Sequence, residues 1–398
     1  MKATYVVSIA MLAIVIGQIT VAPDAWAISG LDRVYLSGFE DPCSEDSDGD
    51  RLANCVETNT GDFINPANTG TSPTDPDTDK DGLLDGDEVL QTLSGINLRD
   101  FGVSPVHKDI LIEYDWFDDL LGCGAHSHRP TTQTIDSIRG IFANAVVANP
   151  DGITGINVIQ DYGQGGAFTG GNLIPDPDGE ITDGLSSQFF GYKAANFSPA
   201  KAGYFHYAIL PHYLSSSGGT FTGLAEVTGD DFIVAVFCYY NVSSAVVSTI
   251  VHELGHNLGL LHGGRDNCNY KPNYNSVMNY MYNGSGDANC DAVGDGVIDY
   301  SYGRNIDLNE SNLDENIGVC SDQIVPIDWN SNGIIEPSIQ QDLNHLEPSQ
   351  DALCGGTLSV LHDYNDWANL YFEGVRYNNF LLKNAQENVV LCDLPIGG

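Results

Sequence analysis

The stretch HELGHNLGLLH, residues His252 to His262, places three imidazoles and one carboxylate at a spacing that predicts a metal site. His252 and His256 are four residues apart, so on a helix they project from one face and can hold a single ion, with Glu253 beside the open coordination position. Gly259 can adopt a positive φ without a Cβ clash, so we expect the helix to stop there and the chain to bring His262 in as the third ligand. Three neutral nitrogen ligands leave a fourth position for water, which is the catalytic pattern of a zinc site.

A second segment, Ser276-Val277-Met278-Asn279-Tyr280, follows the histidine motif. Together the two resemble the metzincin metallopeptidases, whose zinc helix is followed by a Met-containing turn. The resemblance is specific over about residues 108–281. It implies that Met278 forms an apolar floor under the histidines and that Tyr280 can reach the metal or the oxyanion. Gly263, directly after the third histidine, matches no large branch, so astacin, serralysin and pappalysin-like branches stay open.

The resemblance implies a fold of the α/β (α+β) class, with a mixed twisted sheet and an active-site helix. We predict a secreted zinc-dependent endopeptidase (a hydrolase) in which zinc activates a water and Glu253 acts as general base. Tyr280 would hydrogen-bond the developing oxyanion. Two alternatives stay open: a non-catalytic calcium-dependent surface or adhesion module on a metzincin fold, and a zinc hydrolase of non-protein substrates. The intact Glu253 argues against the first, because a binding module needs no general base.

An acidic loop near the N-terminus has oxygen ligands at positions 1, 3, 5 and 12 of a calcium loop and Gly82 at the sharp turn. Pro73 and Pro76 argue against an entering helix, so an EF-hand is not expected. The loop instead resembles the thrombospondin type-3 calcium repeats, and a partial copy precedes it with Arg51 in place of the glycine. The proposed ligands are Asp77, Asp79, Asp81 and Glu88 in the second copy, and Asp46, Asp48, Asp50 and Glu57 in the first. A solvated acidic linker is the alternative. We expect calcium to order this region with little effect on the catalytic domain, because we expect the two cores to be separate.

The N-terminus carries Lys2, a long apolar run and the cleavage signature Ala25-Trp26-Ala27. We therefore predict a signal peptide over 1–27 and an extracellular, periplasmic or cell-surface location, with an uncleaved anchor as the alternative. The remaining expected boundaries are a linker over 28–42, the repeats over 43–100, and the catalytic domain over 101–398, with a lower subdomain from about 263.

The formal net charge is −39, and removing residues 1–27 takes away Lys2 and Asp24, which leaves it unchanged. A polyanion of this size should repel nucleic acid and anionic membranes, so the expected partners are protein or peptide substrates. No segment after the N-terminal run is long and apolar enough for stable membrane insertion. The sequence leaves the oligomeric state and the substrate specificity open.

Nine cysteines suit an oxidising compartment and suggest four disulfides with one thiol left over. The plausible local pairs are Cys43 with Cys55 and Cys268 with Cys290, because each closes a short loop, although connectivity cannot be deduced from sequence. The odd thiol raises the possibility of a cysteine switch in which a thiolate occupies the zinc. Cys123 is a candidate for that role, and a plain free or intermolecular thiol is the alternative.

Between the acidic loops and the zinc helix the chain alternates as an α/β sheet does. The pattern predicts strands over 109–114, 153–160, 204–210 and 232–237, helices over 131–148 and from about 246, and an edge strand over 222–227 that can pair with an extended peptide. His126 and His128 have metal-like spacing, but without a third ligand nearby they favour a polar surface loop. His206 lies in an apolar strand and is expected in the core.

Overall fold

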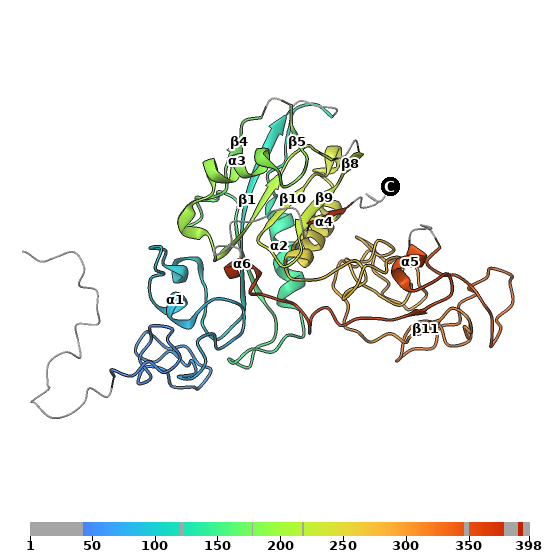
Figure 1. The fold of residues 1–398 in the computed structure, drawn as a ribbon, viewed down its shortest axis with the longest axis horizontal. Coiled ribbons are helices and arrows are strands. Elements are labelled where there is room, and N and C mark those ends of the chain that lie inside the picture. Colours follow the sequence, from blue (N-terminus) through green and yellow to red (C-terminus); the bar gives the residue numbers. More distant parts are fainter. Residues whose placement is uncertain are drawn as a thin grey trace, which may run out of the picture. The chain divides into compact units, whose positions relative to one another are not determined.

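The computed structural model describes residues 43–119, 123–176, 178–216, 219–345, 350–377 and 389–392, so the predicted signal peptide and linker lie outside the described residues. Figure 1 shows a mixed α/β fold in which helices pack on a central sheet. The helices are α1 Asp85–Val89, α2 Thr132–Ala143, α3 Ser187–Asn196, α4 Ser243–Asn257, α5 Gln350–Cys354 and α6 Gly374–Tyr377. The strands are β1 Asp109–Asp119, β2 His126–Ser127, β3 Asn157–Asp161, β4 Leu173–Ile174, β5 Glu180–Thr182, β6 Phe205–Leu210, β7 Tyr213–Ser216, β8 Gly219–Phe221, β9 Gly223–Glu226, β10 Asp231–Val234, β11 Leu308–Asn309, β12 Val360–Leu361 and β13 Val389–Cys392.

The main sheet has the order β13-β9-β10-β6-β1-β2, and β3 and β4 also pair with β1. Strands β3, β1, β6 and β10 run parallel, whereas β9 is antiparallel to β10 and β13 is antiparallel to β9. The fold class predicted from the sequence, α/β (α+β) with a mixed sheet and an active-site helix, is confirmed.

Each face of the sheet contributes side chains to a different apolar cluster, because successive side chains of a strand point to opposite sides. Ile110, Ile112 and Tyr114 of β1 pack with α2 and α4 in one cluster. Leu111 and Phe117 pack with α3 and β5 in the other. Helix α2 begins where Thr131 accepts a hydrogen bond from the Thr134 amide, and its apolar positions repeat at helical spacing, so it can cover the first face. Helices α2 and α4 thus lie on the same face of the sheet.

The predicted strands and helices correspond to β1, β3, β6, β9, β10, α2 and α4, with ends shifted by several residues. One expectation about them was wrong. The segment predicted as an edge strand is β9, and its outer side is already paired with β13 of the same chain, from Val389 opposite Glu226 to Cys392 opposite Gly223. The pairing partner of β13 lies far away in the sequence, so local patterning could not place this strand at the edge of the sheet.

The acidic loops and the sheet share a core. The described residues from Glu45 onward belong to one compact unit, and Leu83 and Leu98 belong to the same apolar cluster as Leu111 and Phe117. The Asp109 amide, at the start of β1, donates to Asp81 Oδ2 at 2.7 Å. The expectation of separate cores is thus wrong, because the loop docks directly on the first strand.

The region after α4 contains its own small cluster around Leu308, Leu313 and Val319. Two disulfides bind it together, Cys268–Cys354 and Cys290–Cys320. The predicted pair Cys268 with Cys290 is therefore wrong, because the folded chain brings more distant cysteines together than loop length suggests. Both Cys43 and Cys55 are disulfide-bonded.

No helix within the described residues has the length and apolar character needed to cross a bilayer.

Cys123 forms a disulfide with Cys238, so it is not a free thiol and cannot act as a cysteine switch. The free cysteine among the described residues is Cys392, which is buried at the end of β13.

Candidate active site

Helix α4 carries His252 and His256 one turn apart, and their Nε2 atoms lie 3.1 Å from each other. Two nitrogens bound to one tetrahedral zinc at ~2.05 Å would be about 3.3 Å apart. Both side chains are fully buried. The predicted helix therefore places the first two candidate ligands at the separation that one ion requires.

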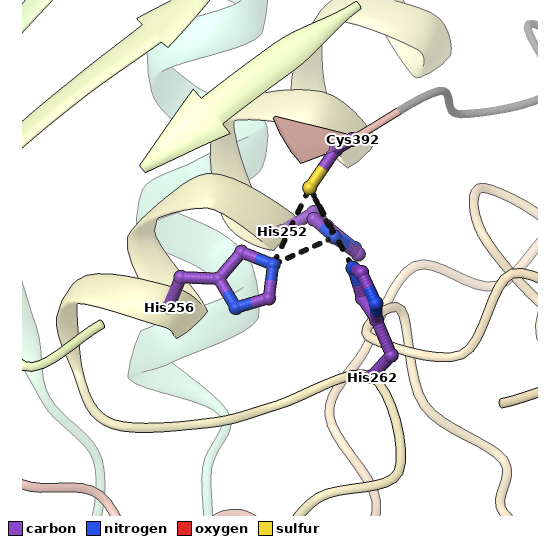
Figure 2. A group of neighbouring side chains, drawn as sticks. All are labelled: His252, His256, His262 and Cys392. Carbon is purple, nitrogen blue, oxygen red and sulfur yellow. Dashed lines mark hydrogen bonds between the residues drawn. The ribbon is translucent and has the colours of Figure 1, made fainter. Parts of the chain in front are cut away.

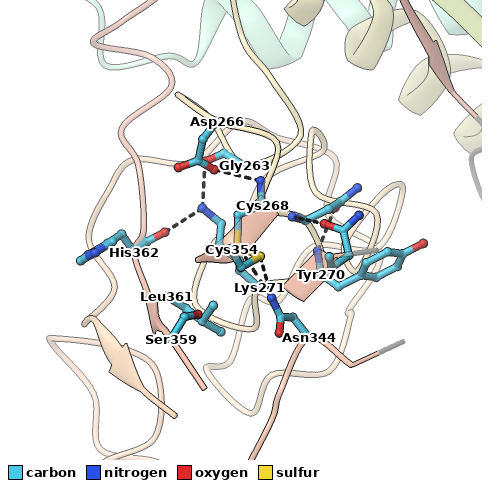
Figure 3. The surroundings of a disulfide bond; sticks show 12 residues. Gly263, Asp266, Cys268, Tyr270, Lys271, Asn344, Cys354, Ser359, Leu361 and His362 are labelled. Atoms are coloured by element: carbon cyan, nitrogen blue, oxygen red, sulfur yellow. Dashed lines mark hydrogen bonds between the residues drawn. A yellow bond between two sulfur atoms is a disulfide. The ribbon is translucent and has the colours of Figure 1, made fainter. Parts of the chain in front are cut away.

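The helix ends where the sequence predicts. Gly259 has φ +88°, in the left-handed region that a glycine adopts without strain. The chain then turns and brings the His262 ring to 5.0 Å from the His256 ring, centroid to centroid. Next to it, Gly263 has no room for a Cβ, which would fall 2.2 Å from Asp266 Oδ1. Lys271 Nζ donates to the carbonyls of Gly263 and His362, as Figure 3 shows, and so fixes the turn that presents His262.

Backbone carbonyls set the tautomer of both helix histidines. His252 Nδ1 donates to the Val277 carbonyl at 2.9 Å, and His256 Nδ1 donates to the Leu260 carbonyl at 2.7 Å. Because a carbonyl can only accept, the proton sits on Nδ1 and the Nε2 lone pair points into the site. Burial lowers the pKa of His256 to about 4 and that of His252 well below its ordinary value. The imidazoles are therefore neutral and ready to bind a metal at neutral pH.

The Met-containing turn lies against the helix between the two histidines. A Cβ on Gly255 would fall 2.4 Å from Met278 Sδ, so the glycine allows the turn to approach. Asp366 accepts from Ser276 Oγ at 2.6 Å and from Tyr274 at 2.8 Å and so holds this turn from the C-terminal region. The Tyr280 ring centroid lies 4.5 Å from that of His262. Both predicted residues, Met278 and Tyr280, are thus beside the histidines.

Glu253 is fully buried next to the edge of the sheet, and burial raises the pKa of its carboxyl well above the ordinary value. Its carboxylate occupies the space where Gly223 of β9 has no side chain, because a Cβ there would fall 1.9 Å from Glu253 Oε1. The absence of a side chain on β9 lets the candidate general base approach the strand. Asn257 also ties the end of the helix to the sheet, donating to the carbonyls of Glu226 and Asp231.

Cys392 completes the histidine cluster, as Figure 2 shows. Its Sγ lies 3.4 Å from the Nε2 atoms of His252 and His256 and 3.6 Å from that of His262. A sulfur at ~2.3 Å and a nitrogen at ~2.05 Å on one tetrahedral zinc are about 3.6 Å apart. The four atoms therefore fit one tetrahedron, with the thiol at the vertex that a catalytic site keeps for water. The sequence indicated an odd thiol and the idea of a switch, but not which cysteine.

The acidic loops bring together the carboxylates that the sequence predicts as calcium ligands, and a further carboxylate lies among them. Glu88 is fully buried, and its two carboxylate oxygens, like Asp79 Oδ2, have no hydrogen-bond partner. Asp85, which the sequence reasoning missed, has a ligand oxygen within 4.8 Å of those of Asp50 and Glu57. Oxygens of Asp46, Asp48 and Asp50 form a neighbouring group. Buried oxygens without donors fit a hard cation such as calcium.

The buried carboxyls in these loops have raised pKa values. Burial and neighbouring carboxylates raise the pKa of Glu57 to about 8 and that of Asp50 to about 6. Burial raises the pKa of Asp85 to about 7, with Asp50 and Asp77 contributing in the same direction. Arg51 stands in the first loop where the second loop has Gly82, and its backbone has φ +83°, a left-handed conformation that is unusual for a residue other than glycine. The Arg51 guanidinium forms an ion pair with Asp87 of the second loop.

Four other histidines lie outside the catalytic cluster and were singled out by the sequence or lie beside one that was: His126, His128, His206 and His212. His206 is a buried core histidine as predicted, with Nδ1 3.0 Å from Asn257 Oδ1, and burial lowers its pKa to about 4. His126 and His128 were expected to lack a third ligand, and this is wrong. His212, distant in the sequence, lies beside both of them.

The histidines, the glutamate and the methionine, on α4 and in the segment that follows it, define a zinc metallopeptidase, a hydrolase. Residues 180–305 match the family model described as gametolysin peptidase M11, and this match includes His252, His256, His262 and Glu253. Among solved structures, the archaemetzincin of Methanopyrus kandleri matches with 16% identity and a TM-score of 0.24, over 44% of this chain and 81% of that one. No curated protein sequence matches the chain.

Proposed function

We propose that this chain is a secreted zinc endopeptidase that cleaves protein or peptide substrates. One observation carries the proposal: the imidazoles of His252, His256 and His262 converge with a buried carboxylate, Glu253, directly beside strand β9. A peptide that pairs with β9 would pass over the three nitrogens, since β13 already does so. The site thus combines a metal cradle, a base and a backbone edge that recognises extended chains.

Zinc held by the three histidines supplies a Lewis acid that polarises the scissile carbonyl and lowers the pKa of water. Glu253 accepts a proton from the attacking water at its carboxylate and delivers it to the leaving amine. Its buried position suits this role, because burial raises the pKa of its carboxyl and favours proton uptake. Tyr280 is close enough to the histidines to donate its hydroxyl to the developing oxyanion. Once β13 has left, the backbone groups on the outer side of β9 would hold the substrate extended.

The proposal includes latency. With Cys392 as a fourth protein ligand the zinc site is closed, and closed sites are structural whereas catalytic ones keep a position open. Strand β13 also occupies the pairing edge of β9 that a substrate would use. The arrangement therefore corresponds to an inactive form, and the thiol and its strand must leave before a peptide can bind. Because the thiol takes the position of the attacking water, the chain's own strand can pair there without being cut.

The acidic region forms the second part of the proposal. We assign calcium to the second loop through Asp77, Asp79, Asp81 and Glu88, and to the first through Asp46, Asp48, Asp50 and Glu57, with Asp85 added. Buried oxygens without hydrogen-bond donors support this assignment. Residues 1–27 act as the signal peptide, 28–42 as a linker, 43–100 as the calcium repeats and 101–398 as the catalytic domain. The disulfides suit the oxidising compartment that secretion implies.

A peptide library with mass-spectrometric detection of cleavage sites tests the activity. The wild type, after release of β13 by a thiol reagent, should cut internal peptide bonds with a defined subsite preference. Glu253→Gln keeps the size of the side chain but removes the base, so we expect turnover to fall by at least about a hundredfold while zinc content is unchanged. Near-normal turnover of this variant would refute the mechanism.

The two alternatives give different results in that assay. A non-catalytic adhesion module would bind zinc and calcium but cut nothing after the thiol is released. A zinc hydrolase of other substrates would spare all peptides yet lose its activity in Glu253→Gln.

A further inference from the structure

Three imidazoles outside the catalytic site meet at one point. His126 lies in β2, His128 follows it directly, and His212 lies between β6 and β7. His126 Nε2 is 3.0 Å from both His128 Nε2 and His212 Nδ1, and the last two atoms are 3.2 Å apart. Each of the three nitrogens therefore faces the other two.

Backbone hydrogen bonds position two of these histidines. The His128 amide donates to the Phe117 carbonyl of β1 at 3.0 Å, and the His212 amide donates to the Gly179 carbonyl at 2.9 Å. His128 and His212 are buried, and His126 is half-buried. Main-chain hydrogen bonds to β1 and to the residue before β5 thus position two of the three histidines.

Hydrogen bonds can pair these three nitrogens only through a single shared N–H. His126 Nδ1 lies 2.6 Å from the Gly124 carbonyl, so it carries the proton, and Nε2 presents a lone pair to the other two rings. Protons on His128 and His212 could both point at that lone pair, but they would then meet each other across 3.2 Å. One cation at the centre accepts a lone pair from all three nitrogens at once.

The separations agree with those in the catalytic site. The nitrogen pairs in this cluster are 3.0 to 3.2 Å apart, and the Nε2 atoms of His252 and His256 are 3.1 Å apart. Both sets are close to the roughly 3.3 Å expected for two nitrogens on one tetrahedral zinc. Both also use a ring whose other nitrogen donates to a backbone carbonyl, the arrangement that orients metal-binding histidines.

We propose that His126, His128 and His212 bind a second zinc ion. Three imidazole ligands favour a borderline transition metal over calcium or magnesium, which prefer oxygen. Cys123 lies close to His126 and His212, but its sulfur is in the disulfide with Cys238 and is not available as a thiolate.

The second ion would connect the β1–β2 hairpin to the corner between β6 and β7. The Cys123–Cys238 disulfide joins the same hairpin to the segment before α4. The Tyr240 ring stacks on His126 with centroids 4.2 Å apart and covers one side of the cluster. The zinc and the disulfide together would fix the end of the sheet from which the chain enters the catalytic helix.

Metal counting tests this proposal without depending on peptidase activity. The full-length protein is stripped with chelator, reloaded with zinc alone, freed of unbound metal and measured by elemental analysis. We expect about two zinc ions in the wild type and about one in His126→Gln/His128→Gln. His252→Ala/His256→Ala should also hold about one. The matched control His345→Gln changes an exposed imidazole and should keep about two.

A second readout guards against misfolding of the double variant. The single variant His126→Gln alters only the half-buried ring. Zinc should raise the melting temperature of His252→Ala/His256→Ala, in which only the second site remains. Zinc should not raise the melting temperature of the triple variant that also carries His126→Gln. Peptidase activity should persist in His126→Gln, since this residue lies outside the catalytic cluster. A wild type that never exceeds one zinc, or a His126→Gln/His128→Gln variant that still holds two, would overturn the second site. Loss of the catalytic ion alone would instead count against the proposed function.

Discussion

The zinc cluster on α4 and the acidic loops before β1 both bury several candidate ligands, but burial acts on them in opposite directions. In the zinc cluster it lowers the pKa of the imidazoles and leaves them neutral. In the loops it raises the pKa of the carboxyls, which repel one another when ionised. Neutral ligands can be buried before a metal arrives, whereas clustered carboxylates need either protons or a cation. We infer that folding alone forms the zinc site, whereas the acidic loops need calcium to become ordered.

The largest expected effect concerns His256→Ala. Two ligands rarely hold the ion, so we expect most of the catalytic zinc to leave and activity to fall at least about a thousandfold, which corresponds to the several kcal/mol that a bound zinc contributes. The melting temperature should change little, because the imidazoles are buried in neutral form. Elemental analysis, peptide cleavage and thermal unfolding measure the three quantities. A collapse of stability as large as that caused by calcium removal would contradict a preformed site.

The next effect is an increase in activity. Cys392→Ser removes the soft ligand from the fourth position while β13 keeps its other contacts, so the open form becomes more populated. We expect kcat/KM on a library-derived peptide to rise about ten- to a hundredfold, with the zinc content unchanged. Val390→Ala, on the same strand, is the matched control and should leave the thiol in place and the enzyme latent. Equal activity of wild type and Cys392→Ser would show that the thiol does not close the site.

The smallest effect concerns the stability of the acidic loops as a function of pH. Without calcium, the pKa values of Asp50, Asp85 and Glu57 in the folded protein are about 6, 7 and 8, above the ordinary 3.8 to 4.5. The folded state therefore binds more protons than the unfolded state, so this contribution is fully present below about pH 4 and is lost as pH rises toward 8. In chelator, the melting temperature should fall by several degrees between pH 5.5 and 8.

Calcium should remove that dependence by replacing the protons. The variant Asp79→Asn/Glu88→Gln keeps the shape of both side chains but reduces the repulsion, so chelator should destabilise it less than the wild type. Because Leu83 and Leu98 share a core with β1, we expect limited proteolysis in chelator to affect the sheet as well as residues 43–95. A melting temperature in chelator that is independent of pH would exclude the proposed repulsion.

Sequence reasoning located the groups that a single local motif carries. His252, His256 and His262 lie within one helix and its turn, so helical spacing and Gly259 decide their geometry. The second acidic loop is local in the same sense. Met278 and Tyr280 were also predicted beside the site, on the basis of a resemblance.

The groups that were missed depend on long-range contacts. Cys392 is separated from His252 by 140 positions, and His212 is separated from His126 by 86. The disulfide partner predicted for Cys268 was wrong for the same reason. A short loop costs less entropy to close, but the packing of the region after α4 decides the pairing. A β strand that adds to a sheet from elsewhere in the chain carries no local signal of its partner.

The position of Asp85 has a thermodynamic consequence. In sequence it belongs to the second acidic loop, where its carboxylate accepts from the Thr78 amide at 2.9 Å, yet a ligand oxygen lies within reach of Asp50 and Glu57 in the first. An ion in one loop would thus orient a carboxylate needed by the other, and binding of the two ions would be positively cooperative. Calorimetric titration with calcium should give a transition steeper than two independent sites allow, and Asp85→Asn should reduce it to independent binding. The two repeats would then respond to calcium as one switch.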